Sequence, residues 1–147
     1  MNNINELYRN LIIKHYHKSN NKGLIKKNNS NDYLIMEKKN ISCSDRIILQ
    51  VKLEKQIIVD IKYETEGCII LTASASLMSI YLKNQKIETA LRKKNIFINM
   101  LKNNFFKNNL LEEELQIFLL VKKFPGKVIC ASMPWNLLEE IILNKKN

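Results

Sequence analysis

Long apolar segments are missing from this sequence. No apolar run approaches the ~20 residues that a helix needs to cross a bilayer. The polar start, MNNINELYRN, also lacks the basic and then apolar layout of a secretory signal peptide. These two absences predict a cytoplasmic protein that has no membrane partner.

Cysteine is scarce as well, with three residues in the whole chain. An odd number excludes a framework in which every cysteine is paired, and thiols in a reducing compartment are more often buried, metal-bound or reactive. No Cys-x-x-Cys pair occurs, so the spacing alone is not a recognisable zinc signature. The three cysteines are therefore the first candidates for chemistry.

Acidic residues are outnumbered, 14 against 24 Lys and Arg, which gives a net charge of +10. Such a charge favours an acidic partner, a nucleic acid or a membrane surface. However, Lys, Asn and Ile are abundant along the whole chain while Gly and Pro are rare, which indicates a general bias rather than one basic face. No nucleic-acid motif and no interleaving of aromatic and basic residues is present, so we expect no nucleic-acid partner.

Hydrophobic residues make up 46% of the 147, enough to bury a core in a single domain over residues 1–147. Apolar side chains at helical spacing, or helix-favouring composition, predict several helices. The expected helices cover residues 4–18, 69–82, 87–101 and 110–120, and a last one begins near Pro134, since proline suits a first helical turn.

Alternating apolar and polar side chains predict an antiparallel hairpin of residues 47–53 and 57–64, and a short strand over 33–38 precedes it. Residues 19–31, rich in Asn and Lys, predict a mobile connection before that strand. The expected fold class is therefore α+β, a small antiparallel three-stranded sheet with helices packed on it.

The three cysteines lie at boundaries between the expected elements. Cys43 is in the turn before the hairpin, Cys68 follows Gly67 where a helix begins, and Cys130 immediately precedes the last helix. Gly67 allows a close approach of the backbone, and zinc prefers four ligands, so three thiolates need one more donor. Asp45 is the nearest candidate. From these residues alone, three separately buried thiols are at least as good an interpretation as a metal site.

Longer motifs around these residues resemble the SufU branch of the IscU/SufU/NifU scaffold family. The run GC followed by ASAS is a specific marker, and the three cysteines and Asp45 fall on the metal-ligand positions of the family. The matching segments, which span nearly the whole chain, are LYRNLIIKHY (7–16), SCSDRIILQVKLE (42–54), YETEGCIILTASASLMS (63–79), IETAL (87–91) and KKFPGKVICASMPWNLLE (122–139).

Two features resemble SufU more than IscU. IscU-type scaffolds carry His immediately before the third ligand cysteine, where this chain has Ile129. Residues 102–122 also match an additional segment of SufU-type proteins. The resemblance therefore implies the ligand set Cys43, Asp45, Cys68 and Cys130, and it leaves His15 and His17 as ordinary surface or partner-facing residues.

The resemblance implies a function in iron–sulfur cluster assembly. A zinc ion would be held by the four ligand residues, and Cys43 would accept persulfide sulfur from a PLP-dependent cysteine desulfurase of the SufS type. Downstream SUF assembly proteins would take the sulfur further. Whether the chain acts as an enzyme or as co-substrate and activator of the desulfurase stays open. The alternative is a scaffold that assembles a [2Fe–2S] cluster on the same residues.

Two positions depart from the family pattern. Ser44 stands where Gly is usual, and Lys127 stands where SufU-type proteins have an Arg that helps to dock the desulfurase. The lysine keeps the charge but loses the planar two-point grip of a guanidinium. Lys127 is therefore the candidate for partner docking, whereas Arg46 is expected to be a solvated charge and Trp135 a helix-packing anchor. Close helix packing is expected of Ser74 and Ser76.

Overall fold

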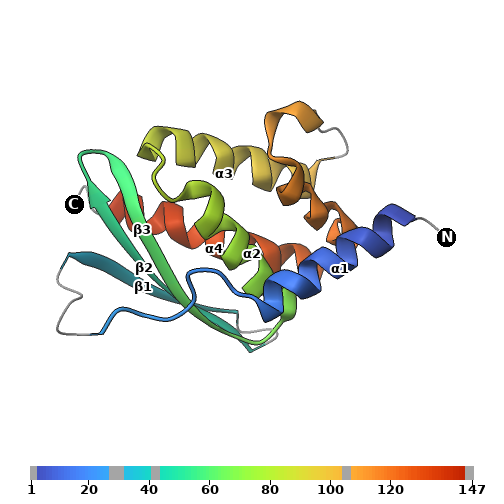
Figure 1. Ribbon diagram of the computed structural model, residues 1–147, viewed down its shortest axis with the longest axis horizontal. Helices are drawn as coiled ribbons and strands as arrows, with labels where there is room; N and C mark the ends of the chain where they lie inside the picture. The colour runs from blue at the N-terminus through green and yellow to red at the C-terminus, as the bar shows by residue number, and fades with distance from the viewer. Residues whose placement is uncertain (1–2, 27–31, 41–43, 104–106, 145–147) are drawn as a thin grey trace.

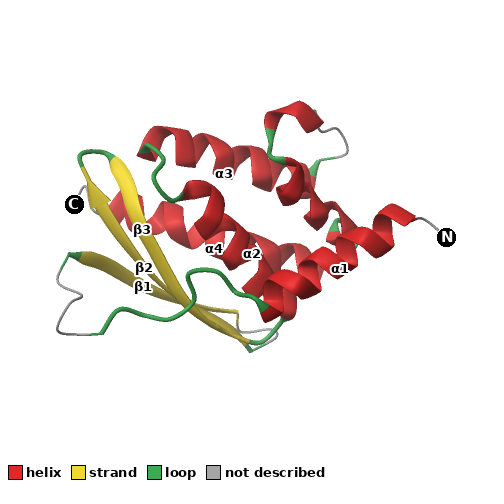
Figure 2. Ribbon diagram, viewed as in Figure 1, coloured by secondary structure: helices red, strands yellow, loops and turns green. Residues whose placement is uncertain are grey.

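The structure, a computed structural model, describes residues 3–26, 32–40, 44–103 and 107–144. Figure 1 and Figure 2 show its helices gathered on one face of a three-stranded sheet. No helix in these ranges is both long and apolar enough to span a membrane. In chain order the elements are α1 (Asn3–His17), β1 (Tyr33–Asn40), β2 (Asp45–Glu54), β3 (Ile57–Glu66), α2 (Ile69–Leu82), α3 (Ile87–Lys102), the 3-10 helices η2 (Asn108–Leu110) and η3 (Glu113–Val121), and α4 (Pro125–Asn144).

The sheet has the order β1-β2-β3 with both pairs antiparallel, as predicted. Lys55 and Gln56 connect β2 to β3 with φ of 51° and 65°, the left-handed backbone that a two-residue hairpin turn needs at both positions. On β2 the side chains of Ile47, Leu49 and Val51 are fully buried under the helices. Because side chains alternate between the two faces of a strand, every second residue of β2 points to the helices.

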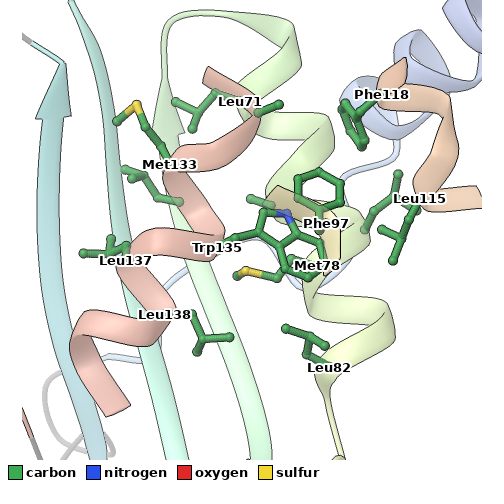
Figure 3. Close-up of a cluster of buried hydrophobic side chains, with 14 of the residues drawn as sticks. Leu71, Met78, Leu82, Phe97, Leu115, Phe118, Met133, Trp135, Leu137 and Leu138 are labelled. Carbon is green, nitrogen blue, oxygen red and sulfur yellow. The ribbon is translucent and has the colours of Figure 1, made fainter. Parts of the chain in front are cut away.

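Helices α2 and α4 pack on each other, α2 contacts β3, and α4 contacts β1 and β2. The bounds of α2 are those predicted. Ser74 joins the two helices, because its hydroxyl donates to the carbonyl of Ala131 (2.6 Å) and accepts from the Trp135 indole N–H (3.0 Å). Figure 3 shows Trp135 in the middle of the buried cluster beside Phe97, and the two rings are stacked with centroids 4.3 Å apart. The packing roles expected of Ser74 and Trp135 are confirmed.

The predicted start of the last helix was wrong. Helix α4 begins at Pro125, and Pro134 lies inside it. Pro125 supplies the first helical turn, the role that was predicted for Pro134. Cys130 therefore lies within the helix and not before it.

The segment predicted as one helix over residues 110–120 forms two 3-10 helices, η2 and η3. In η3 the buried residues Leu115, Phe118 and Val121 are three apart, which matches the three residues per turn of a 3-10 helix. The predicted position was close, but the type of helix differs.

The connection predicted to be mobile is held in place over its first part. The Gly23 N–H donates to the Tyr63 carbonyl (2.8 Å), and the Ile25 N–H donates to Gln50 Oε1 (2.6 Å). The Asn20 N–H also donates to the Ser76 hydroxyl. Residues 19–26 are thus fixed to the sheet and to α2, while residues 27–31 lie outside the described ranges.

His15 is buried, with 5% of its surface exposed, so the prediction of a surface role was wrong. Its Nε2 lies 2.7 Å from Glu114 Oε2, and the Tyr81 hydroxyl donates to Glu114 Oε1 at the same distance. Burial raises the pKa of Glu114, but the hydrogen bonds from Tyr81 and His15 outweigh it and hold that pKa below its usual value. This cluster joins α1, α2 and η3.

Candidate functional site

Asp45 lies at the start of β2 and points to the helices, in the same alternation as Ile47. Only 2% of its surface is exposed. Its Oδ1 accepts the backbone N–H of Cys68 at 3.0 Å, and its Oδ2 accepts the Cys130 thiol at 2.7 Å. The carboxylate therefore joins the end of β3, the start of α2 and the second turn of α4, and it brings together three of the four predicted ligand residues.

Gly67 is needed for this arrangement. Its φ is +114°, and a Cβ atom added there would lie 2.1 Å from Asp45 Oδ1 and 3.1 Å from Asp45 Cα. Real Cβ atoms do not come so close to an oxygen, and side chains other than glycine avoid this backbone conformation. The close approach predicted for Gly67 is confirmed, and its partner is the candidate ligand Asp45.

Ser44, the departure from the family pattern beside Asp45, has φ of +60°. This is the left-handed region, in which glycine carries no steric cost and other residues pay roughly 1 kcal/mol. The backbone thus explains why glycine suits this position, and in this chain an exposed serine adopts the same turn.

Lys127, in the first turn of α4, reaches across to the start of α2. Its Nζ lies 3.4 Å from Cys68 Sγ, and the hydrogen bond to Cys68 together with the charge of that thiol raises the pKa of Lys127. Arg46 cannot play this part, because it lies on the other face of the sheet and pairs with Glu37 and Glu66. The cation at the site is therefore Lys127.

The two described thiols differ in accessibility: Cys68 is half-buried and Cys130 is buried. Cys43 lies outside the described residues. Within the described part of the chain, no group of three or more His, Cys, Asp or Glu side chains is arranged to hold a metal ion. The complete ligand set, with Cys43 as the fourth member, therefore remains a prediction.

The donor atoms at this junction suit a thiophilic ion. The Cys130 thiol and the Asp45 carboxylate are in contact, Cys68 is held beside them through its backbone N–H, and structural zinc sites use thiolates together with one carboxylate or imidazole. The carboxylate is also pre-oriented, because the Cys68 N–H holds one oxygen and leaves the other facing Cys130. The residues present fit a zinc ion, and they would also fit a cluster of iron and sulfide.

Exposed apolar side chains next to these residues were not predicted. Ile69 follows Cys68, Ile129 precedes Cys130, and Phe124 lies just before α4, each with more than a third of its surface exposed. The available signal was an isoleucine directly beside each of two candidate ligands.

Known proteins and a known family are similar to this chain in sequence. Residues 7–131 match the family described as NifU-like N terminal domain. The chain is 37% identical over 138 residues to the zinc-dependent sulfurtransferase SufU of Bacillus subtilis, with 94% of this chain and 90% of that protein covered. It is 34% identical to the iron–sulfur cluster assembly scaffold protein IscU of Streptococcus pyogenes, over 74% of this chain and 68% of that protein.

A solved structure of a protein named as a SufU is also similar to this chain. The protein FiSufU from Fervidobacterium islandicum, described as an iron–sulfur cluster assembly scaffold protein for the SUF system, superposes with a TM-score of 0.78 at 29% identity. That match covers 89% of this chain and 93% of the other. The fold, the motifs and these relatives together show that the chain belongs to the NifU-like N-terminal domain family of iron–sulfur cluster assembly proteins, as a member of the SufU type.

Proposed function

We propose that this chain is a zinc-dependent sulfur-transfer protein of the SUF pathway of iron–sulfur cluster assembly. Cys43 receives persulfide sulfur from a PLP-dependent cysteine desulfurase of the SufS type, and cytoplasmic SUF assembly proteins receive it afterwards. The observation that carries the proposal is the buried carboxylate of Asp45, which accepts the Cys68 N–H and the Cys130 thiol, with Lys127 in contact with the Cys68 sulfur. The relative named as a zinc-dependent sulfurtransferase supports the same function.

The residues proposed to hold the zinc ion are Cys43, Asp45, Cys68 and Cys130. When bound, zinc keeps its thiol ligands deprotonated at neutral pH. Asp45 keeps its orientation through the Cys68 N–H. Three thiolates and one carboxylate carry more negative charge than a divalent ion supplies, and the Lys127 ammonium beside Cys68 offsets part of the excess.

The sulfur transfer itself is an exchange at sulfur. The Cys43 thiolate attacks the outer sulfur of the desulfurase persulfide and forms a new S–S bond. The S–S bond of the donor breaks, and its electron pair leaves on the desulfurase cysteine, which becomes a thiolate. The outer sulfur keeps its proton, so the products are a Cys43 persulfide and a free donor cysteine, without any net oxidation.

Cys43→Ala tests the acceptor role. We expect this variant to lose stimulation of the cognate desulfurase, measured as sulfide release from cysteine in the presence of a reductant, because no other residue is proposed as the acceptor. Mass spectrometry should find the added sulfur, 32 Da, on the wild-type Cys43 peptide and not on the variant. Full stimulation by Cys43→Ala would overturn the acceptor role.

The alternative function is a scaffold that holds a [2Fe–2S] cluster on the same residues. The observation in its favour is the donor set, which suits either group, and a relative is named as an IscU scaffold protein. Anaerobic reconstitution with iron and sulfide separates the two functions. A stable visible chromophore favours the scaffold, whereas a colourless protein that retains zinc favours sulfur transfer.

A further inference from the structure

A groove of about 830 Å³ lies between α3 and η2 and takes no part in the proposed function. We propose that this groove, called the α3 groove below, binds an acidic amphipathic helix of a partner protein. Asp45, Cys68 and Cys130 are not among the residues that line it. Figure 1 shows α3 at the side of the molecule away from β1, and α3 packs mainly on α4 and η3. The inference therefore does not rest on the metal site.

Three apolar side chains line the α3 groove. Leu91 and Ile96 of α3 are half-buried and pack against the core, and Leu110 of η2 is 52% exposed. The α3 residues that line the groove run from Glu88 to Asn99 along one face of the helix. This length of helix is about 17 Å, or three turns. The α3 groove therefore offers apolar contacts over the length of a short helix.

The walls of the α3 groove favour a helix as its occupant. All the described residues that line it belong to α3, to η2 or to Lys107, the N-cap of η2. No strand edge is among them, so an extended peptide would find no row of free backbone groups with which to pair. A helix needs only a groove that receives apolar side chains at every third or fourth position.

The charge of the α3 groove favours an acidic occupant. Lys93 and Lys94 of α3 pair with glutamates of the neighbouring segments. Arg92 and Lys107 line the groove, are exposed, and take part in no ion pair among the described residues. Glu88 also lines the groove, but it lies in the first turn of α3, where a carboxylate offsets the positive end of the helix dipole. Carboxylates of a partner would therefore meet two available cations.

A second copy of the chain and a nucleic acid fit the α3 groove less well. In a two-fold contact each residue near the axis meets its own counterpart, so Arg92 and Lys107 would face the same cations. The net charge of +10 also opposes self-association. A single-stranded nucleic acid stacks its bases on aromatic side chains, and the described residues that line the groove include no aromatic one.

The test uses the full chain and two synthetic peptides as probes. Each peptide is a helix of about 14 residues with leucines three and four residues apart, and its polar positions are Glu in one peptide and Lys in the other. We expect the Glu peptide to bind with a Kd of about 10 μM and the Lys peptide about tenfold more weakly, by fluorescence anisotropy at about 0.1 M salt. In an NMR titration the amide shifts should change along residues 88–99 and 107–110.

Two variants test the charge and the apolar contact separately. Arg92→Glu should weaken the Glu peptide by about tenfold and strengthen the Lys peptide, whereas Leu110→Ser should weaken the Glu peptide by a similar factor without that reversal. Arg9→Glu and Leu143→Ser are the matched controls, because they make the same kinds of change at exposed positions on α1 and α4, outside the groove. Thermal melting should confirm that each variant is folded.

Equal binding of the two peptides, or amide shifts outside the α3 groove, would overturn the proposal. A dimer in sedimentation velocity that Leu110→Ser dissociates, or displacement of the Glu peptide by single-stranded DNA, would assign the groove to another occupant and overturn it as well. Cys43→Ala should bind the Glu peptide as tightly as the wild type does. A failure of the proposed function would therefore leave the α3 groove to be judged by the peptides alone.

Discussion

Two carboxylates in this protein each hold separate segments of the chain together, but their surroundings differ. Asp45 accepts hydrogen bonds from Cys68 and Cys130, and Glu114 is hydrogen-bonded to Tyr81 and lies close to His15. Each joins segments that are far apart in the sequence. The partners of Glu114 are an imidazole and a phenol between packed helices, which stabilise the fold. The partners of Asp45 include the backbone N–H of Cys68 and the buried thiol of Cys130, two of the residues proposed to hold zinc.

Asp45 and Glu114 are therefore fixed in the same way, each by hydrogen bonds with groups from other elements of the fold. A carboxylate fixed by donors from two elements holds its geometry before any ligand arrives. Around Asp45 the donors are a backbone N–H and a thiol, and one of the thiols is half-buried beside an exposed lysine. Variants that change one carboxylate at a time measure how far the two regions differ.

The largest expected effect is that of Gly67→Ala. The added Cβ would overlap Asp45 Oδ1, and alanine would have to adopt φ of +114°. We expect a loss of about 3 kcal/mol in the free energy of unfolding, measured by urea denaturation. Gly126→Ala is the control, because nothing lies within 4 Å of its Cβ position and its φ is not positive. A loss no greater than that of the control would contradict the close approach at Asp45.

Asp45→Ala is expected to have the next largest effect on folding and the clearest effect on metal. It leaves the Cys68 N–H without its acceptor, which costs about 2 kcal/mol of unfolding free energy. We expect zinc affinity to fall more than tenfold, measured by competition with a chelator and by elemental analysis. Unchanged metal stoichiometry would remove Asp45 from the ligand set.

Glu114→Gln should have the smallest effect, with no change in zinc content. At neutral pH we expect a loss of about 1 kcal/mol in unfolding free energy, because the charged hydrogen bonds become weaker. Since folding lowers the pKa of Glu114, its contribution is complete above the unfolded value of about 4.3 and is lost as the pH falls through the folded value. The two proteins should therefore become equally stable once the pH falls below the folded pKa of Glu114.

The neighbouring Glu113→Gln is the control for this pH dependence. Glu113 is exposed, and its substitution should leave the unfolding free energy unchanged at every pH. A difference between Glu114→Gln and wild type that persisted at the lowest pH would show that the carboxylate charge is not the cause.

The sequence predicted the elements whose patterns are local. The hairpin followed from alternation along β2 and β3, and α2 followed from an unbroken run of helix-favouring residues. The junction at Asp45 could be expected because glycine before Cys68 marks a close backbone approach, although the resemblance to the family was needed to select Asp45 as the carboxylate.

The features that the sequence did not predict depend on distant partners. The order of residues 19–26 comes from hydrogen bonds to Gln50, Tyr63 and Ser76, which no local pattern indicates. The burial of His15 depends in the same way on Glu114, 99 residues away. The start of α4 was misplaced because two prolines suit a first turn, and only the packing of Cys130 and Ala131 distinguishes between them.

The second of those prolines makes the position of Cys130 depend on contacts outside its own helix. Pro134 has no N–H to donate to the carbonyl of Cys130, so α4 lacks one backbone hydrogen bond at the residue that carries a candidate ligand. Ser74 of α2 holds α4 on both sides of this gap, through the Ala131 carbonyl before it and the Trp135 indole after it. The orientation of the Cys130 thiol is therefore set by α2 and by Asp45 as well as by the helix that carries it.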